Sequence, residues 1–229
     1  MKTKFNYTYL YKEQFIRAIL SGERNLSRVF LYRFDHNSNL LISDFEKHPY
    51  FPGFLAYLEE QEEELKTNPI RLGDSNLVGL IAPGLYFPFT RGRGVNFTGA
   101  NLKGANLTRA YFNDSNFNSV CLTNAVLGET NFTNTDLSNS LCINTDSSYA
   151  RFRNANLKDV DFKNANLIGA DFRGANLDGT NFDSAKLAKV DIRGAKNLEH
   201  ALNLYLDAQL EIRADTKELG ILNQIAANH

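Results

Sequence analysis

A five-residue period in hydrophobicity runs through the middle of this 229-residue chain and constrains its fold more than any other feature. Taking every fifth residue from Phe97 to Ile192 gives 20 positions, and 17 of them hold Leu or Phe. A second column, two residues earlier and running from Val95 to Val190, holds only Ala, Val, Ser or Thr. An α-helix repeats every 3.6 residues and a β-strand every two, so neither keeps this phase over such a length. The period therefore predicts a solenoid of short units stacked around one core.

The repeating units are similar to a known motif. Stretches such as Ala100 to Leu107 and Ala165 to Phe172 resemble the A-(D/N)-L-x-x motif of the pentapeptide-repeat family, and the resemblance covers roughly residues 95–196. It implies an all-β solenoid, a right-handed quadrilateral β-helix in which each pentapeptide forms one side and four sides close one coil. The repeats would then make about five regular coils, and a spacing of about 4.8 Å between coils gives a column of roughly 24 Å.

A four-sided coil predicts that residues 20 positions apart lie directly over one another. Phe112, Phe132, Phe152 and Phe172 have this spacing, so we expect their rings to stack inside the column. The coil formed by residues 130–149 carries less apolar volume, because Thr and Ser occupy its inward small positions. Two interpretations stay open for this coil. It is either tolerated drift in a repeat held from both sides, or a local bulge with a functional purpose.

Apolar residues also occur at a position that should face outward. The residue just before each large inward residue is Asn, Asp or charged in most repeats, but it is apolar at Tyr111, Cys121, Val126 and Leu141, and Ile143 follows on the same side as Leu141. An exposed apolar patch of this kind often marks a contact surface. We therefore predict a partner surface at these five residues.

The segment that precedes the regular repeats combines aromatic and basic residues. It contains Tyr86, Phe87, Phe89, Arg91 and Arg93. Such a segment could grip an anionic or aromatic ligand, and the alternative is a loop that packs against the first coil. Both interpretations remain open from the sequence.

The flanking segments have the apolar spacing of helices and suit the ends of an open solenoid, which must be covered. Helices are expected at Lys12–Leu20, Phe54–Lys66, Asn197–Leu206 and Thr216–Ala226. The predicted organisation is an N-terminal cap at 1–69, with a short helix, an atypical first turn and a helical insertion at 49–66; a degenerate entry to the solenoid at 70–94; the pentapeptide-repeat β-helix at 95–196; and a C-terminal helical cap at 197–229.

No grouping of residues in the sequence specifies catalysis, a cofactor or a metal. The two cysteines, Cys121 and Cys142, fall in an outward and an inward column, so their Cβ atoms diverge and a disulfide is not expected. All four histidines lie outside the repeats, which leaves no Cys/His pair and no zinc-ligand spacing. We expect no catalytic, cofactor-binding or metal site, and an enzyme is the least favoured function.

The charge balance limits the choice of partner. The chain has 25 basic and 26 acidic residues, a net charge of −1, and residues 95–196 hold 11 basic and 10 acidic residues. This balance favours neither a nucleic-acid partner nor the DNA-mimicking, gyrase-binding function that the family resemblance offers as an alternative, since a mimic must be strongly acidic. The sequence therefore favours a non-catalytic protein-interaction module or scaffold, with a homodimer left open. With no signal peptide or membrane-spanning run, a cytoplasmic, reduced location is expected.

Overall fold

The computed structural model describes residues 8–10, 29–31, 34–35, 38–41, 60, 62–201 and 212–227 of the chain. The helix expected at Lys12–Leu20 and most of the one expected at Phe54–Lys66 lie outside these residues.

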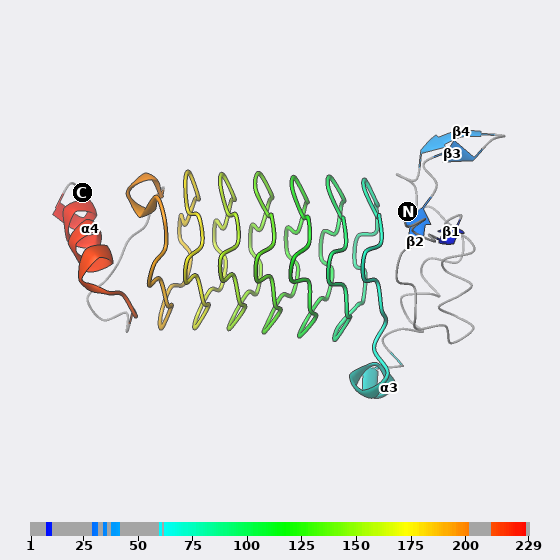
Figure 1. Ribbon diagram of the computed structural model, residues 1–229, viewed down its shortest axis with the longest axis horizontal. Coiled ribbons are helices and arrows are strands. Elements are labelled where there is room, and N and C mark those ends of the chain that lie inside the picture. The colour runs from blue at the N-terminus through cyan, green and yellow to red at the C-terminus, as the bar shows by residue number, and fades with distance from the viewer. Residues whose placement is uncertain are drawn as a thin grey trace, which may run out of the picture.

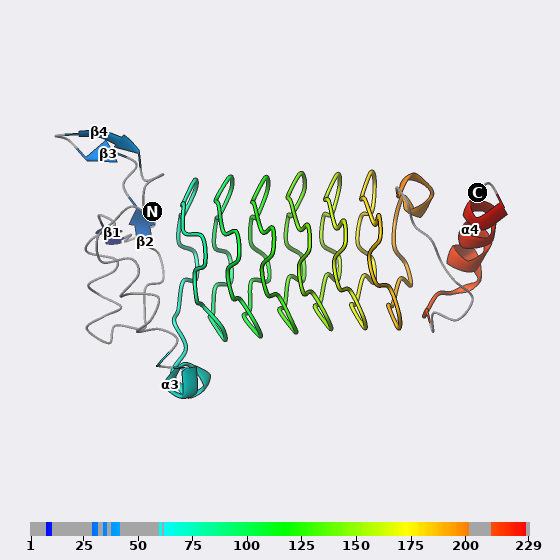
Figure 2. The same cartoon turned by 180° about the vertical axis from the view of Figure 1, so that it is seen from behind.

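The described repeats form a column of stacked coils in the middle of the molecule (Figures 1 and 2). Parallel β-bridges join residues 20 positions apart, from Arg71 with Arg91 to Asn176 with Lys196, so the predicted period of four pentapeptides per coil is confirmed. Each pentapeptide contributes one bridging residue. The sides of the coil are therefore built from isolated bridges and not from the continuous strands expected of an all-β solenoid.

Each pentapeptide makes a turn within itself and hydrogen bonds to the coils on both sides. Within one unit the Ala100 N–H donates to the Phe97 carbonyl at 2.8 Å. Between coils the Phe97 N–H donates to the Asn116 carbonyl at 2.7 Å, and the Asn116 N–H donates to the Val95 carbonyl at 2.9 Å. The corner residue of the turn has a positive φ, as at Asn124 with 61°, which favours Gly, Asn and Asp at this position.

The Asn or Asp of the motif is explained by a local hydrogen bond. The Asn96 Oδ1 accepts from the Thr98 N–H at 3.0 Å, and the same bond recurs in other repeats. Some of these amides also bond from coil to coil, as where the Asn176 Nδ2 donates to the Asn156 Oδ1 at 3.0 Å. A polar residue here therefore stabilises both the turn and the stack.

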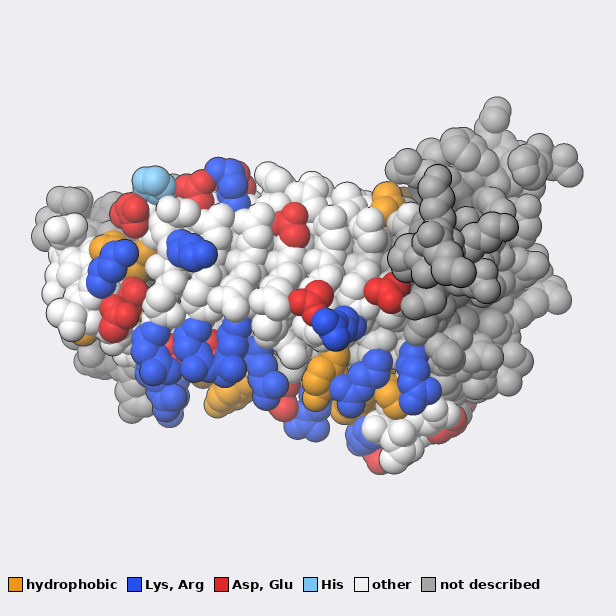
Figure 3. Space-filling model, in the orientation of Figure 1, with side chains coloured by type: hydrophobic (Ala, Val, Ile, Leu, Met, Phe, Trp, Pro, Cys, Tyr) orange, Lys and Arg blue, Asp and Glu red, His pale blue; other side chains and the backbone are white. Residues whose placement is uncertain are grey.

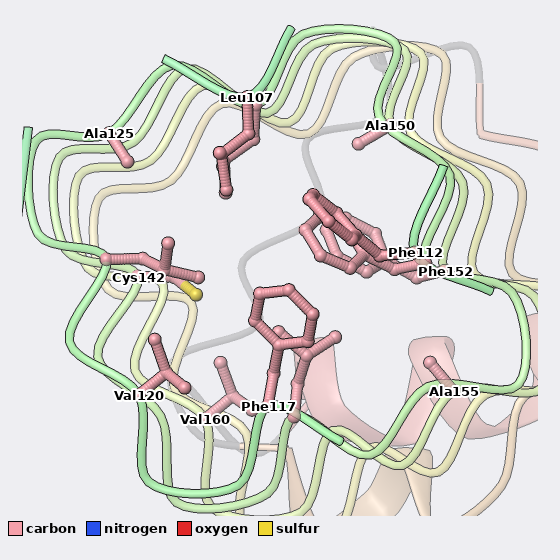
Figure 4. Packing of buried hydrophobic residues seen from close by; sticks show 14 of the residues in the cluster. Leu107, Phe112, Phe117, Val120, Ala125, Cys142, Ala150, Phe152, Ala155 and Val160 are labelled. Carbon is pink, nitrogen blue, oxygen red and sulfur yellow. The ribbon is translucent and has the colours of Figure 1, made fainter. Parts of the chain in front are cut away.

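The core is a column of stacked apolar side chains (Figure 4). The predicted phenylalanine stack is confirmed, because the centroid of the Phe152 ring lies 5.6 Å from that of Phe132 and 5.2 Å from that of Phe172, with interplanar angles of 4° and 9°. The Phe112 ring continues the stack below Phe132, at 5.9 Å and 26°. All four rings are buried.

The polar coil at residues 130–149 keeps the same turns and bridges as its neighbours, so the bulge considered from the sequence is absent. Its inward hydroxyl groups donate to backbone carbonyls. Thr130 Oγ1 donates to the Leu107 carbonyl at 2.8 Å and Thr135 Oγ1 to the Phe112 carbonyl at 2.6 Å. These hydrogen bonds satisfy the buried hydroxyl groups, so the polar coil keeps the same backbone conformation as its neighbours.

The coiled pattern extends N-terminally to Arg71, with Leu72, Leu77 and Phe87 buried in the core. Before it lies the helix α3 (Glu62–Thr67), beside the first coils, with Leu65 buried. Four short strands lie beyond this end: β1 (Thr8–Leu10) pairs in parallel with β2 (Val29–Leu31), and β3 (Phe34–Asp35) pairs antiparallel with β4 (Ser38–Leu41).

At the other end the chain returns to the last coil. Arg213 forms a parallel bridge with Asp191 and accepts a bond from the Ile192 N–H at 2.9 Å. The helix predicted at Thr216–Ala226 is present as α4 (Thr216–Ala227), and its first turn has a capping box in which Asp215 and Glu218 each accept from the other's backbone N–H.

The prediction of a helix at Asn197–Leu206 is wrong for the part of this segment that the structure describes. Only the 3-10 helix η2 (Leu198–His200) forms, and Ala201 is already extended. Asn197 has a positive φ of 54° and no side-chain capping bond, so the helical spacing of this segment lacks a start signal.

Candidate functional site

Three residues of the predicted apolar patch lie together on one side of the coil. Cys121 and Leu141 are direct bridge partners in adjacent coils, and Ile143 follows two residues after Leu141. We call the side formed by the pentapeptides that begin at residues 81, 101, 121, 141, 161 and 181 the Leu141 wall. Leu141 is 44% exposed, and Val126, on the adjoining wall, is 38% exposed.

The fifth predicted residue, Tyr111, lies on the opposite wall. Its pentapeptide also contains Phe112, and Figure 4 shows Phe112 and Cys142 projecting into the core from opposite sides. The structure therefore divides the predicted patch into an apolar group around Leu141 and a separate aromatic residue at Tyr111.

The exposed apolar residues are not required by the local fold. They occupy the position at which Asn or Asp elsewhere accepts a hydrogen bond from the backbone two residues on, so this bond is missing at Leu141 and Val126. The backbone bonds between coils remain, as where the Leu141 N–H donates to the Val120 carbonyl at 2.9 Å. Leu or Val in place of Asn or Asp at this position thus removes a stabilising hydrogen bond and exposes apolar surface.

The predicted basic and aromatic segment is also divided by the structure. Phe87 is fully buried in the core. The Tyr86 hydroxyl donates to Glu62 of α3 at 2.6 Å, so Tyr86 attaches α3 to the solenoid. That hydrogen bond is the main cause of the lowered pKa of Glu62. Phe89 is half-buried at a corner with φ 61°, whereas Arg91 and Arg93 are exposed.

Arg91 and Tyr111 form the centre of a basic and aromatic site that the sequence analysis did not assemble. The guanidinium carbon of Arg91 lies 3.8 Å from the centroid of the Tyr111 ring, within the range of a cation–π contact. A shallow hollow of about 290 Å³ lies beside the pair and is also lined by Arg71 and Arg93. The signal that could have joined them is the 20-residue spacing of Arg71, Arg91 and Tyr111, which applies to outward residues as it does to the core.

A second hollow, of about 160 Å³, lies on the other side of Tyr111 and reaches Arg109, Glu129 and Arg151. Arg109 binds Glu129 at 2.7 Å, and this hydrogen bond is the main reason that the pKa of Glu129 is lowered. Both hollows therefore open on the same strip of surface. In Figure 3 basic side chains gather along the edge of the column where α3 lies, with apolar side chains among them.

The described residues offer little reactive chemistry. Burial raises the pKa of the Cys142 thiol to about 12, so this sulfur stays protonated at neutral pH. Both cysteines are free, as predicted. Within the described ranges, no cluster of three or more His, Cys, Asp or Glu side chains could hold a metal, and none of the helices has the length and hydrophobicity to cross a membrane.

Comparisons with known proteins place the repeats in a family. The model of the pentapeptide repeat region matches residues 115–192, and the model of pentapeptide repeats in eight copies matches residues 93–128. No curated protein matches the chain.

Several solved structures are similar to this chain. Full-length QnrB1, a plasmid-mediated fluoroquinolone resistance protein, is 12% identical over 88% of this chain and 82% of its own, with a TM-score of 0.38. HetL of Nostoc sp. strain PCC 7120, which is involved in heterocyst differentiation regulation, is 18% identical over 91% and 97%, with a TM-score of 0.25. A pentapeptide repeat protein of the Arabidopsis thaliana thylakoid lumen is 27% identical over 51% and 68%, with a TM-score of 0.26. The two family matches and the coils of four pentapeptides show that residues 93–192 of this chain are repeats of the pentapeptide-repeat family.

Proposed function

We propose that this chain is a non-catalytic scaffold, a right-handed quadrilateral β-helix with capped ends, which binds another protein through the apolar group on and beside the Leu141 wall. The observation that carries the proposal is the exposure of Leu141 and Val126, at 44% and 38%, at positions where other repeats place a hydrogen-bonding side chain. Apolar surface that costs a local bond is best explained by a partner that covers it.

The rigidity of the column supports this role. Residues in an inner coil bond to the coils before and after, and stacked rings fill the interior, so the outward side chains sit on a fixed frame. A preorganised surface loses little conformational entropy when it binds. Two described thiols that remain free are compatible with the reducing cytoplasm that the sequence favours.

The charges of the column argue against the alternative of a DNA mimic. A mimic needs a continuous acidic surface, but aspartates of the described solenoid are paired with basic side chains. Examples are Asp114 with Arg93, Asp178 with Lys158 and Asp183 with Lys163. Pairing of this kind cancels the field that a DNA-binding partner would recognise.

The test is a pull-down from source-cell extract with the tagged wild-type chain and with the double variant Leu141→Lys/Val126→Lys. We expect the double variant to lose the captured partner, because two buried charges in an apolar interface are strongly unfavourable. The matched control is Ala188→Lys, a partly exposed site without a side-chain bond at the far end of the column. Sedimentation of the same three proteins shows whether the partner is a second copy of this chain. Unchanged capture and unchanged self-association in the double variant would refute the proposal.

A further inference from the structure

The charged side chains are distributed unevenly over the four walls of the coil, although the net charge of the whole chain is close to zero. We define the Arg91 wall as the side formed by the pentapeptides that begin at residues 71, 91, 111, 131, 151, 171 and 191. Its outward positions hold seven arginines and four aspartates. The arginines are Arg71, Arg91, Arg93, Arg151, Arg153, Arg173 and Arg193. One side of the column is therefore distinctly basic although the whole chain has a net charge of −1.

Three arginines near the C-terminal end of this wall already have carboxylate partners. Arg153 and Arg173 bind Asp171, with Arg173 at 2.8 Å, and Arg193 binds Asp191 at 2.6 Å. Burial opposes ionisation of Asp171, but the hydrogen bonds from the two arginines outweigh it and lower its pKa to about 2. These three arginines share two carboxylates, so their charge is partly compensated.

Three other arginines of this wall lack such a partner, whereas Arg93 binds Asp114 at 2.9 Å. Among the described residues, Arg71, Arg91 and Arg151 make no ion pair, although Arg91 lies over the Tyr111 ring. Arg71 and Arg91 are moreover direct bridge partners, and like charges placed opposite each other in a ladder are destabilising. Asp171 and Asp191 are also bridge partners, but arginines bind them. No described carboxylate lies within ion-pair distance of Arg71 or Arg91, so an anion bound there would relieve a repulsion.

Aromatic rings accompany the unpaired arginines. Tyr111, one coil after Arg91, is 38% exposed between the two hollows. Tyr149 is 59% exposed at the corner that leads into Arg151. Its ring lies against Gly169, where a Cβ atom would stand only 2.5 Å from the ring, so the absence of a side chain at Gly169 lets the ring lie flat on the corner. The two exposed rings, of which Tyr111 lies under the Arg91 guanidinium, offer aromatic surface on which bases can stack.

We propose that the Arg91 wall binds single-stranded nucleic acid along the axis of the column, with phosphates on Arg71, Arg91 and Arg151 and bases stacked on Tyr111 and Tyr149. A charged track with aromatic platforms is the arrangement that binds single strands without sequence preference. The five coils from Arg71 to Arg151 span about 19 Å, the length of roughly five to six stacked nucleotides.

Other anionic partners fit this wall less well. An acidic peptide could pair with the arginines, but it would leave the tyrosine rings without planar groups to stack on. Phosphate groups also suit this wall, because a guanidinium group can form two parallel hydrogen bonds to phosphate oxygens. A membrane surface would need a broad basic plane, whereas this wall is a single pentapeptide wide. The Arg91 wall lies opposite the Leu141 wall, so its arginines are separate from the Leu141 side of the protein contact proposed above.

The test is fluorescence anisotropy of the full chain with a labelled 12-nucleotide oligo(dT) at low and at physiological salt. We expect Arg71→Gln/Arg91→Gln to weaken binding by about ten-fold or more at low salt and to flatten the dependence of log K on log salt, because each lost phosphate contact removes about 0.7 from the slope. Tyr111→Leu should weaken binding by about ten-fold with an unchanged slope, since it removes stacking and no charge. The matched control is Lys103→Gln/Lys163→Gln on the Leu141 wall, which should bind as the wild type does.

Folding is checked by circular dichroism and thermal unfolding, which Arg71→Gln/Arg91→Gln should leave unchanged or improved. A labelled oligoglutamate peptide and vesicles with about one-third phosphatidylserine are measured under the same conditions. Absence of oligonucleotide binding, an equal loss in the control variant, or tighter binding of the peptide or of the vesicles would each overturn the proposal. Weaker oligonucleotide binding in the Arg91-wall variants, with unchanged binding in the control, would support the proposal. This result does not depend on whether the Leu141→Lys/Val126→Lys variant loses the protein partner.

Discussion

The Phe132 and Phe152 rings lie parallel to within 4°, with centroids 5.6 Å apart, although 20 residues separate them in the chain. This relationship shows how the coil closes. From Phe112 to Phe172 the ring of each turn rests on the ring of the previous turn, so the same contact fixes the register of these coils and fills the space between them. The loss of one ring is therefore felt in both adjacent coils.

Replacement of Phe132 by alanine should lower the free energy of unfolding by about 3–5 kcal/mol, because it leaves a cavity between two stacked neighbours. Phe132→Leu keeps most of the volume and should cost less than about 1.5 kcal/mol. Guanidinium unfolding followed by circular dichroism measures both. Equal losses for the two variants would show that the ring is not packed as the structure has it.

Gly92 makes room for the Phe112 ring one coil later. A Cβ atom at Gly92 would lie 2.6 Å from two atoms of that buried ring, so Gly92→Ala should destabilise the column by about 1–3 kcal/mol through overpacking. The double variant Gly92→Ala/Phe112→Leu should recover part of the loss, which a double-mutant cycle in thermal unfolding would reveal. Strictly additive effects would contradict a direct contact. Gly92 does not have the positive φ of the corner glycines, so the penalty is one of space alone.

The two thiols should differ in reactivity. Cys142 is fully buried and its pKa is raised to about 12, whereas Cys121 is partly exposed on the Leu141 wall. Titration of the native chain with an aromatic disulfide reagent at pH 8 should modify about one thiol per chain, and Cys121→Ser should abolish this reaction. Both cysteines should react in denaturant. Fast modification of Cys142 in the folded chain would show that the coil opens there.

Stability should fall in acid through Asp171. Its folded pKa of about 2 lies below the ordinary value of 3.8, so the ionised carboxylate stabilises the fold above about pH 4, and this contribution disappears as the pH falls towards 2. The shift corresponds to about 2 kcal/mol. Urea unfolding at pH 7, 4 and 2 should show a smaller pH dependence for Asp171→Asn than for the wild type. Arg153→Gln/Arg173→Gln should remove the same dependence, and an unaltered dependence in both variants would assign it to other carboxylates.

Much of this fold could be predicted because the inward positions obey a strict rule of size. Leu or Phe at every fifth residue predicts the column, and the spacing of 20 between Phe112 and Phe132 predicts the stack. The polar coil was harder to predict. Thr130 and Thr135 suggested a bulge, whereas the structure lets their hydroxyls donate to carbonyls of the previous coil, a solution that depends on three-dimensional geometry.

The candidate site could be predicted only in part, because the sequence shows charges in chain order and the coil brings together charges that are 20 residues apart. The sequence analysis places Arg91 and Tyr111 in separate groups and assigns no role to Arg71 or Arg151. Their common 20-residue phase places them on one wall. The contact of the Arg91 guanidinium with the Tyr111 ring depends on side-chain rotamers that periodicity does not specify.

The bridge between Asp191 and Arg213 has a consequence for assembly. A column of identical turns has no intrinsic length, and its last turn presents amide and carbonyl groups on which any similar turn could grow. Here the chain itself returns and occupies them, with the Arg213 N–H bound to the Val190 carbonyl at 2.8 Å. This returning segment acts as a terminator, which blocks end-to-end growth of filaments along this wall and leaves the flanks of the column as the surfaces on which other molecules can dock.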